Sequence, residues 1–250
     1  MVRSFPYATI RFRNVHLLDT NEDTLLIADK ALFKLDVFSL LKSQIDIKGT
    51  TLENGAINIL IDKNGLGNYD ILSSSPGPRE TPAAFAITEA KVSDMNINYQ
   101  DAASKTNVRL KAEDLAIQLH IADQIDIDVL GIVQSKTIKI DDLSYLPNQR
   151  LSLNTGITYH TSKKVLAIED GEFGIEGMVI YADGDITYNG DHEIYDLVLS
   201  NNDGNLESIF KLLPDSKVEE FKKITSSGDF DLTVFYKGKK SKYSNPELQC

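Results

Sequence analysis

The sequence predicts a mainly β protein built from antiparallel strands. Apolar and polar residues alternate over several short runs, as in Ile57, Ile59 and Ile61, and this period of two is typical of strands with one buried and one solvated face. Asn-Gly and Asp-Gly pairs separate many of these runs, and such pairs are strong signals for hairpin turns. One-sided strands joined by short turns favour an antiparallel sheet.

The alternating runs are spread along most of the chain. Apolar side chains occupy every second position, and polar side chains fill most of the positions between them, although Leu60, Leu130 and Phe235 interrupt the polar series. We expect strands at residues 57–62, 95–100, 117–122, 125–130 and 230–237, and turns at 53–55, 63–65, 182–184 and 188–190.

One segment interrupts the strand pattern with loop composition. Residues 73–84 contain three of the seven prolines together with serines and a glycine, which predicts a flexible linker or loop. The segment divides the chain into an N-terminal region, 1–72, and a C-terminal region, 85–250, unless the sheet continues across it.

Two further segments have helical rather than strand periodicity. Apolar residues at helical spacing predict a pair of short amphipathic helices within 205–224, and Pro214 breaks the pair. A smaller helical segment is expected at 36–43, so the N-terminal region follows a strand, short helix, strand order.

Composition excludes several classes of function. The 250 residues carry a formal net charge of −11, and an acidic chain lacks the basic surface that nucleic acid requires. Cys250 stands alone, so an internal disulfide cannot form and cysteine usage does not identify the compartment. No apolar run reaches the roughly 18 residues of a membrane span, and no signal peptide is visible.

The sequence also lacks recognisable metal-binding patterns. None of the four histidines belongs to a metal-ligand motif. The turn that begins at Asp62 resembles a calcium loop, but Ser73 stands where the final glutamate is required, so we expect a hairpin turn. Asp183, Asp185 and Asp191 cluster around two turns, which leaves weak calcium binding as the alternative to turn residues.

No motif selects a catalytic site. The sequence has no nucleophile elbow, no phosphate-binding loop and no dinucleotide-binding glycine pattern. Carboxylates are plentiful, but nothing in the pattern singles out a pair for acid–base chemistry, so a hydrolase has no support from the sequence. We therefore expect a protein that is not an enzyme and that needs no cofactor.

Two regions resemble the AsmA-like family of bacterial envelope proteins. The matching features of the first region follow one another from Phe5-Pro6 through Arg13-Asn14-Val15, Ala28-Asp29-Lys30, Leu35-Asp36-Val37, the short helix Phe38–Leu41, the strand Ile45–Gly49 and Asn58-Ile59 to Gly67–Leu72. The second region runs from Leu206 to Gly238, with paired leucines before Pro214 and a strand that restarts at Gly228-Asp229. These patterns are diffuse and specify a fold more than a site.

The resemblance implies a particular architecture. The family is related in plan to TamB and to the chorein-type bridge-like lipid transfer proteins, which implies a long curved antiparallel sheet that forms an apolar groove, with a few short helices. Residues 1–72 would be the N-terminal chorein-like part, and 85–250 would continue the groove. The membrane helix expected before Phe5 is absent and the sequence stops at Cys250, so we expect a fragment of a larger protein.

The resemblance also implies a role. It places the protein on the periplasmic side of the bacterial inner membrane, attached through an N-terminal helix that this chain does not contain. It implies that the protein moves phospholipid toward the outer membrane or maintains envelope lipid balance, with phospholipid acyl chains and envelope proteins as partners. The family offers no catalytic residues to carry over.

The candidate groove residues are mostly branched aliphatics from the alternating runs. They are Ile45, Ile47, Ile57, Ile59, Ile61, Ile97, Ile117, Leu119, Ile127 and Val129. Each could instead pack in the core of an ordinary sandwich or barrel. The alternative function is a structural or protein-interaction β module of the cell envelope.

Overall fold

A computed structural model describes most of the chain. The described residues are 6–38, 47–69, 88–175, 177–190, 192–205, 208, 210, 212–214, 216, 229–241, 244 and 246–249. The predicted linker at 73–84 and most of the predicted helices at 36–43 and 205–224 lie outside them, although Val37, Phe38, Ser208, Phe210 and Ser216 are helical.

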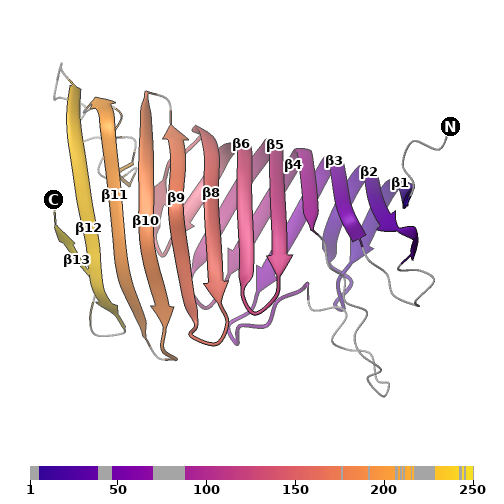
Figure 1. The fold of residues 1–250 in the computed structure, drawn as a ribbon, viewed down its shortest axis with the longest axis horizontal. Helices are drawn as coiled ribbons and strands as arrows, with labels where there is room; N and C mark the ends of the chain where they lie inside the picture. The colour runs from indigo at the N-terminus through magenta and orange to yellow at the C-terminus, as the bar shows by residue number, and fades with distance from the viewer. Residues whose placement is uncertain are drawn as a thin grey trace. The chain divides into compact units, whose positions relative to one another are not determined.

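The described residues form one sheet of thirteen strands, which confirms the mainly β class (Figure 1). The strands are β1 (Tyr7–Leu18), β2 (Thr24–Asp36), β3 (Ile47–Ile61), β4 (Glu89–Asp101), β5 (Thr106–Ile121), β6 (Ile125–Ile140), β7 (Leu143–Tyr145), β8 (Arg150–His160), β9 (Val165–Ile175), β10 (Met178–Tyr188), β11 (Glu193–Asn205), β12 (Asp229–Lys240) and β13 (Glu247–Gln249). They follow chain order except that β7 pairs beside β6. β1 and β13 end the order, so the sheet is not closed.

One strand pair departs from the expected antiparallel pattern. β3 and β4 are parallel, from Thr50 paired with Ala90 to Ile61 paired with Asp101. The strands on either side of residues 73–84 are therefore paired with each other. This agrees with the alternative given above, in which the sheet continues across the segment, and not with a domain boundary there. A parallel pair needs a long connection, and the 27 residues from Asp62 to Thr88 supply it.

The chain forms two compact units. The first contains residues 1–116 and 133–148, and the second contains 117–132 and 149–250. β1–β4 therefore belong to the first unit and β8–β13 to the second, while β5 and β6 contribute to both.

β1, β3 and β4 of the first unit share an irregularity near their middle. Asn14, Asn54 and Asp94 have φ angles of 52°, 55° and 51°, which lie in the left-handed region. Asn and Asp tolerate this conformation better than most residues because their short side chains bond locally. The residues just before them, Arg13, Glu53 and Ser93, align across the sheet through Lys30 of β2.

This irregularity shifts the alternation of side chains. Val92 and Met95 are separated by two residues, and strict alternation would place them on opposite faces. Both are nevertheless buried, and so are Ala28 and Ala31 of β2 and Ala112 and Leu115 of β5. The residues between each pair are polar or charged. We call this four-residue pattern the phase shift, because it keeps apolar side chains on one face along the whole strand.

Gly55 is required beside the phase shift. A Cβ atom at this position would lie 1.9 Å from the carbonyl oxygen of Ile27 on β2. That atom belongs to the backbone of a paired strand and cannot move without breaking the pairing. The same constraint recurs in the second unit at Gly184, where φ is 129° and a Cβ would lie 2.0 Å from the Asp196 carbonyl oxygen.

β9 carries the phase shift in the second unit. Asp170 has a φ of 49°, and its N–H donates to the Asp183 carboxylate at 2.9 Å. The pairing of β9 with β8 and with β10 shifts register at this point. Ile168 and Gly171 therefore lie on one face with two polar residues between them.

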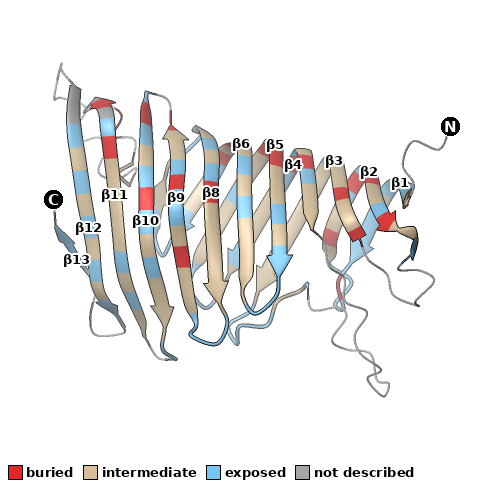
Figure 2. Ribbon diagram, in the orientation of Figure 1, coloured by how far each residue is buried: buried red, intermediate tan, exposed pale blue. Residues whose placement is uncertain are grey.

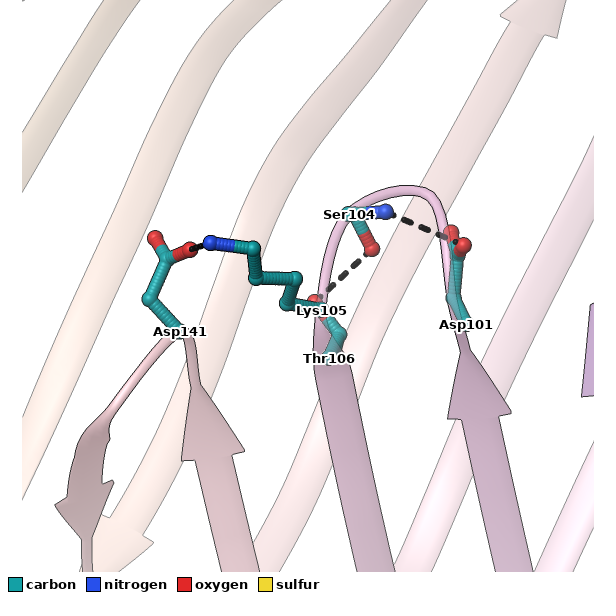
Figure 3. A network of polar contacts seen from close by, with 5 residues as sticks. All are labelled: Asp101, Ser104, Lys105, Thr106 and Asp141. Atoms are coloured by element: carbon teal, nitrogen blue, oxygen red, sulfur yellow. Dashed lines mark hydrogen bonds and ion pairs between the residues drawn. The ribbon is translucent and has the colours of Figure 1, made fainter. Parts of the chain in front are cut away.

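A carboxylate stabilises the turn between β4 and β5 (Figure 3). The Asp101 carboxylate accepts the N–H groups of Ala103 at 2.8 Å and Ser104 at 3.1 Å. Burial disfavours its charged form, but these hydrogen bonds outweigh burial and hold the pKa of Asp101 below its ordinary value. Lys105 in the same turn reaches Asp141 at 3.5 Å (Figure 3).

We expect Asn54→Ala to lower the free energy of unfolding by about 1 kcal/mol, because alanine is costly in the left-handed region. Asn54→Gly should cost much less, because glycine has no Cβ to strain. Denaturant unfolding followed by circular dichroism measures both. Asn96→Ala is the matched control, because it removes a side-chain amide that donates a hydrogen bond but changes a residue without a positive φ. Equal effects of the two alanine substitutions would contradict a role for the backbone conformation.

Candidate functional site

One face of strands β8–β12 is almost entirely apolar. The registers place Ile157, Ile168, Gly184, Leu197 and Tyr236 in one row across the five strands. Alternation in each strand extends this row into a surface that we call the apolar face. Its aliphatic, methionine and phenylalanine members are Leu151, Leu153, Ile157, Leu166, Ile168, Phe173, Ile175, Met178, Ile180, Ile186, Leu197, Leu199, Leu232 and Val234.

The opposite face of the same strands, here the polar face, is mostly charged or hydroxylated, although it also exposes Val179, Ile194 and Phe235. It carries Ser152, Asn154, Thr158, Glu169, Glu172, Asp183, Asp185, Asp196, Thr233 and Lys237. Asp196 and Lys237 form an ion pair there at 2.6 Å. The two faces therefore differ sharply in their affinity for water.

The apolar face is only partly covered. Ile175 and Met178 are buried, whereas the other members listed above are half-buried (Figure 2). Among the described strands of this unit, the strands that contact each other extensively are neighbours in the sheet. Side chains of this kind are usually fully buried in a sandwich core, so the face retains apolar area that a ligand can cover.

Four predicted groove residues belong to the second unit. Ile117, Leu119, Ile127 and Val129 are all half-buried. The Asp126 carboxylate accepts the Thr158 hydroxyl at 2.9 Å, which places Asp126 with the polar face of β8. Alternation then puts Ile127 and Val129 on the same side as the apolar face.

The first unit brings together most of the other predicted groove residues. Ile57 pairs with Leu26 on β2 and with Ile97 on β4, so the three side chains share a row. Ile59 and Ile61 follow on the same face of β3, and all four predicted residues of this group are half-buried. Ile47 is buried and pairs with Leu35. Ile45 lies outside the described residues, and lipid contact at all ten positions stays a prediction.

The predicted turn at 63–65 is confirmed, whereas the turns predicted at 53–55 and 182–184 are wrong, because these residues lie inside β3 and β10. Gly55 and Gly184 permit a close approach to the neighbouring strand there instead of a chain reversal. The Asp62 carboxylate accepts the N–H groups of Asn64 at 2.7 Å and Leu66 at 2.9 Å. These bonds hold the pKa of Asp62 below its ordinary value, the bond from Leu66 contributing most. The carboxylate thus serves the turn, and the described residues contain no group of three or more side chains that could hold a metal ion.

Sequence analysis missed a cluster of tyrosines at one end of the apolar face. We call it the tyrosine end, and its members are Tyr159, Tyr188, Glu193, Tyr195, Tyr236 and Lys240. Glu193 pairs with Tyr188 on one side and with Lys240 on the other. The available signal was the recurrence of tyrosine near the ends of alternating runs, beside a turn.

Glu193 organises the tyrosine end. The Tyr195 hydroxyl donates to its carboxylate at 2.5 Å, and the Tyr195 and Tyr236 rings meet edge to face with centroids 5.2 Å apart. Lys240 Nζ lies 4.0 Å from the same carboxylate. The cluster thus combines phenol groups, one anion and one cation at the margin of an apolar surface.

The tyrosines of this cluster resist ionisation. Burial raises the pKa of Tyr195, and its hydrogen bond to Glu193 and the charge of that carboxylate raise it further. Burial followed by the Glu193 charge likewise raises the pKa values of Tyr188 and Tyr236. Tyrosine is protonated at neutral pH in any case, and the raised pKa values keep these three phenols neutral to higher pH than in the unfolded chain.

We expect the stability of the protein to fall as the pH rises above about 10. The folded state holds these phenols neutral, whereas unfolded tyrosines ionise near their ordinary pKa, so high pH favours unfolding. Glu193→Gln should lower the pKa of Tyr195 and reduce this loss, as phenolate absorbance and denaturant unfolding would measure. Glu169→Gln on the polar face is the control, and an equal effect there would contradict the local cause.

No helix among the described residues has the length and hydropathy needed to cross a membrane.

The chain was compared with protein families, with characterised proteins and with solved structures. The sequence matches no family model, and neither a curated protein nor a solved structure is significantly similar to it.

Proposed function

We propose that this chain is a lipid-handling module that binds phospholipid acyl chains on its apolar faces. The observation that supports it is the half-buried state of many aliphatic side chains on one face of the sheet, such as Ile157, Ile186 and Leu197. A filled protein core would bury them, and a water-exposed surface would not be so uniformly apolar.

The composition of the apolar face suits a chain-like ligand. Each methylene group that leaves water contributes about 0.8 kcal/mol. Rows of similar aliphatic side chains offer many equivalent positions, so an acyl chain gains this energy without one tight site. Such a surface supports movement of lipid along the strands as well as binding.

The cellular role follows from the sequence pattern. The AsmA-like features in residues 5–72 and 206–238 support a protein of the bacterial envelope, located on the periplasmic side of the inner membrane. In this role the module is non-catalytic and conducts phospholipid between membranes or maintains outer-membrane lipid balance. Attachment would be through an N-terminal helix, and envelope proteins would be its partners.

A structural or interaction module is the second candidate function. β1 ends the order of strands and carries Ile10 and Phe12, which are 43% and 48% exposed. Terminal strands with apolar side chains pair readily with strands of other proteins. This role would not need the apolar area in the middle of the sheet.

We expect the purified chain to bind phospholipid, and Leu197→Asp to weaken this binding at least tenfold because a carboxylate would lie against the acyl chain. Native mass spectrometry with lipid identification measures the bound species. Ile194→Asp is the matched control, since Ile194 lies on the other face of β11 and is already 41% exposed.

Two results would count against lipid handling. One is a folded chain that neither carries lipid nor takes up added phospholipid, which would favour the interaction module. The other is equal loss of binding in the two variants, which would show that the apolar face does not hold the acyl chain. Circular dichroism of each variant separates loss of binding from loss of the fold.

A further inference from the structure

We propose that the tyrosine end binds the headgroup of a zwitterionic phospholipid, so that bound lipid lies with a fixed direction on the apolar face of β8–β12. This inference rests on the proposed function and deepens it, because it assigns a headgroup site and a headgroup chemistry. The residues that carry it are Tyr188, Glu193, Tyr195, Tyr236 and Lys240.

The apolar face is graded along its strands. At the end formed by Leu151, Ile175 and Met178 the side chains are apolar. At the opposite end Tyr188, Glu193 and Lys240 form one row. An amphiphile has the same gradient, and its energy is lowest when its apolar and polar parts match those of the surface.

The charges of the tyrosine end complement a zwitterion. Glu193 and Lys240 lie opposite one another on neighbouring strands, with a separation of 4.0 Å and side chains that are 36% and 52% exposed. Lys240 can donate hydrogen bonds to the phosphate, and Glu193 can attract the ammonium group through its opposite charge. An anionic headgroup without an ammonium group would satisfy Lys240 but would leave Glu193 facing a negative charge.

The tyrosines add neutral donors and ring faces. Tyr195 already donates its hydroxyl proton to Glu193, so Tyr188 and Tyr236 are the phenols of this cluster that can donate to phosphate and ester oxygens. Tyrosine rings also attract ammonium groups through cation–π contacts. Tyrosine is well suited to such a boundary because it has an apolar body and a polar tip.

A second ion pair on the same two strands provides a matched control. Asp196 and Lys237 also join β11 to β12, but they lie on the polar face and are held tightly at 2.6 Å. If general electrostatics controlled lipid binding, neutralising either pair would have the same effect. If the tyrosine end holds the headgroup, only the Glu193–Lys240 pair matters.

The test compares phosphatidylcholine with phosphatidylglycerol, both with the same short acyl chains, on the full chain. We expect the double variant Glu193→Gln, Lys240→Gln to bind phosphatidylcholine about tenfold more weakly than the parent chain. It should lose the parent's preference for phosphatidylcholine over phosphatidylglycerol. The variant Asp196→Asn, Lys237→Gln should behave like the parent chain.

A photo-crosslinking experiment tests the direction of the bound lipid. p-Benzoylphenylalanine replaces Tyr159 at the tyrosine end or Leu153 toward the other end of the same strand, β8. After illumination with phosphatidylcholine, mass spectrometry locates the attachment. We expect the headgroup or glycerol at position 159 and the acyl chain at position 153.

The outcomes separate the two proposals. Failure of the parent chain to bind either phospholipid would overturn the proposed function. The headgroup site would be overturned if the Glu193–Lys240 double variant bound phosphatidylcholine as tightly as the parent chain, or if the headgroup attached at position 153. Acyl-chain binding would stand in both cases.

Discussion

The apolar surface of this protein depends on how the backbone places successive side chains near the middle of its strands. In a regular strand, residues three apart point to opposite faces. Asp94 in β4 and Asp170 in β9 adopt left-handed φ angles, and the side chains that flank them return to the same face. Without this shift, β4 and β9 would turn the apolar side chains beyond it to the opposite face.

The separation of the two faces has a cost and a use. Half-buried aliphatic rows forgo part of the stabilisation that a closed core would give. Cross-strand pairing, glycines at close approaches such as Gly55, and turn carboxylates such as Asp62 and Asp101 maintain the sheet instead. The polar face and the net charge of −11 favour solubility, so the apolar area can remain accessible to a ligand.

The tyrosine end gives the apolar face a direction. A uniform aliphatic surface would bind an acyl chain equally well in either orientation. Glu193, Lys240 and the neighbouring tyrosines occupy one end only, and they are close enough to interact with one another. Burial and the charge of Glu193 raise the pKa values of these tyrosines, and the same carboxylate lies at the polar end of the apolar face.

The sequence by itself determined the mainly β class, the alternation within runs such as 57–61 and 95–100, and the turn at Asp62, because alternation and turn chemistry are local properties. It also pointed to Ile57 and Ile97, which the structure pairs. It did not reveal the phase shift, at which strict alternation fails. Only the tertiary structure decided the parallel pairing of β3 with β4, since this depends on a long connection. Likewise, the assembly of Tyr159, Tyr188, Tyr195 and Tyr236 at one end depends on the registers of several strands, which no single run of sequence specifies.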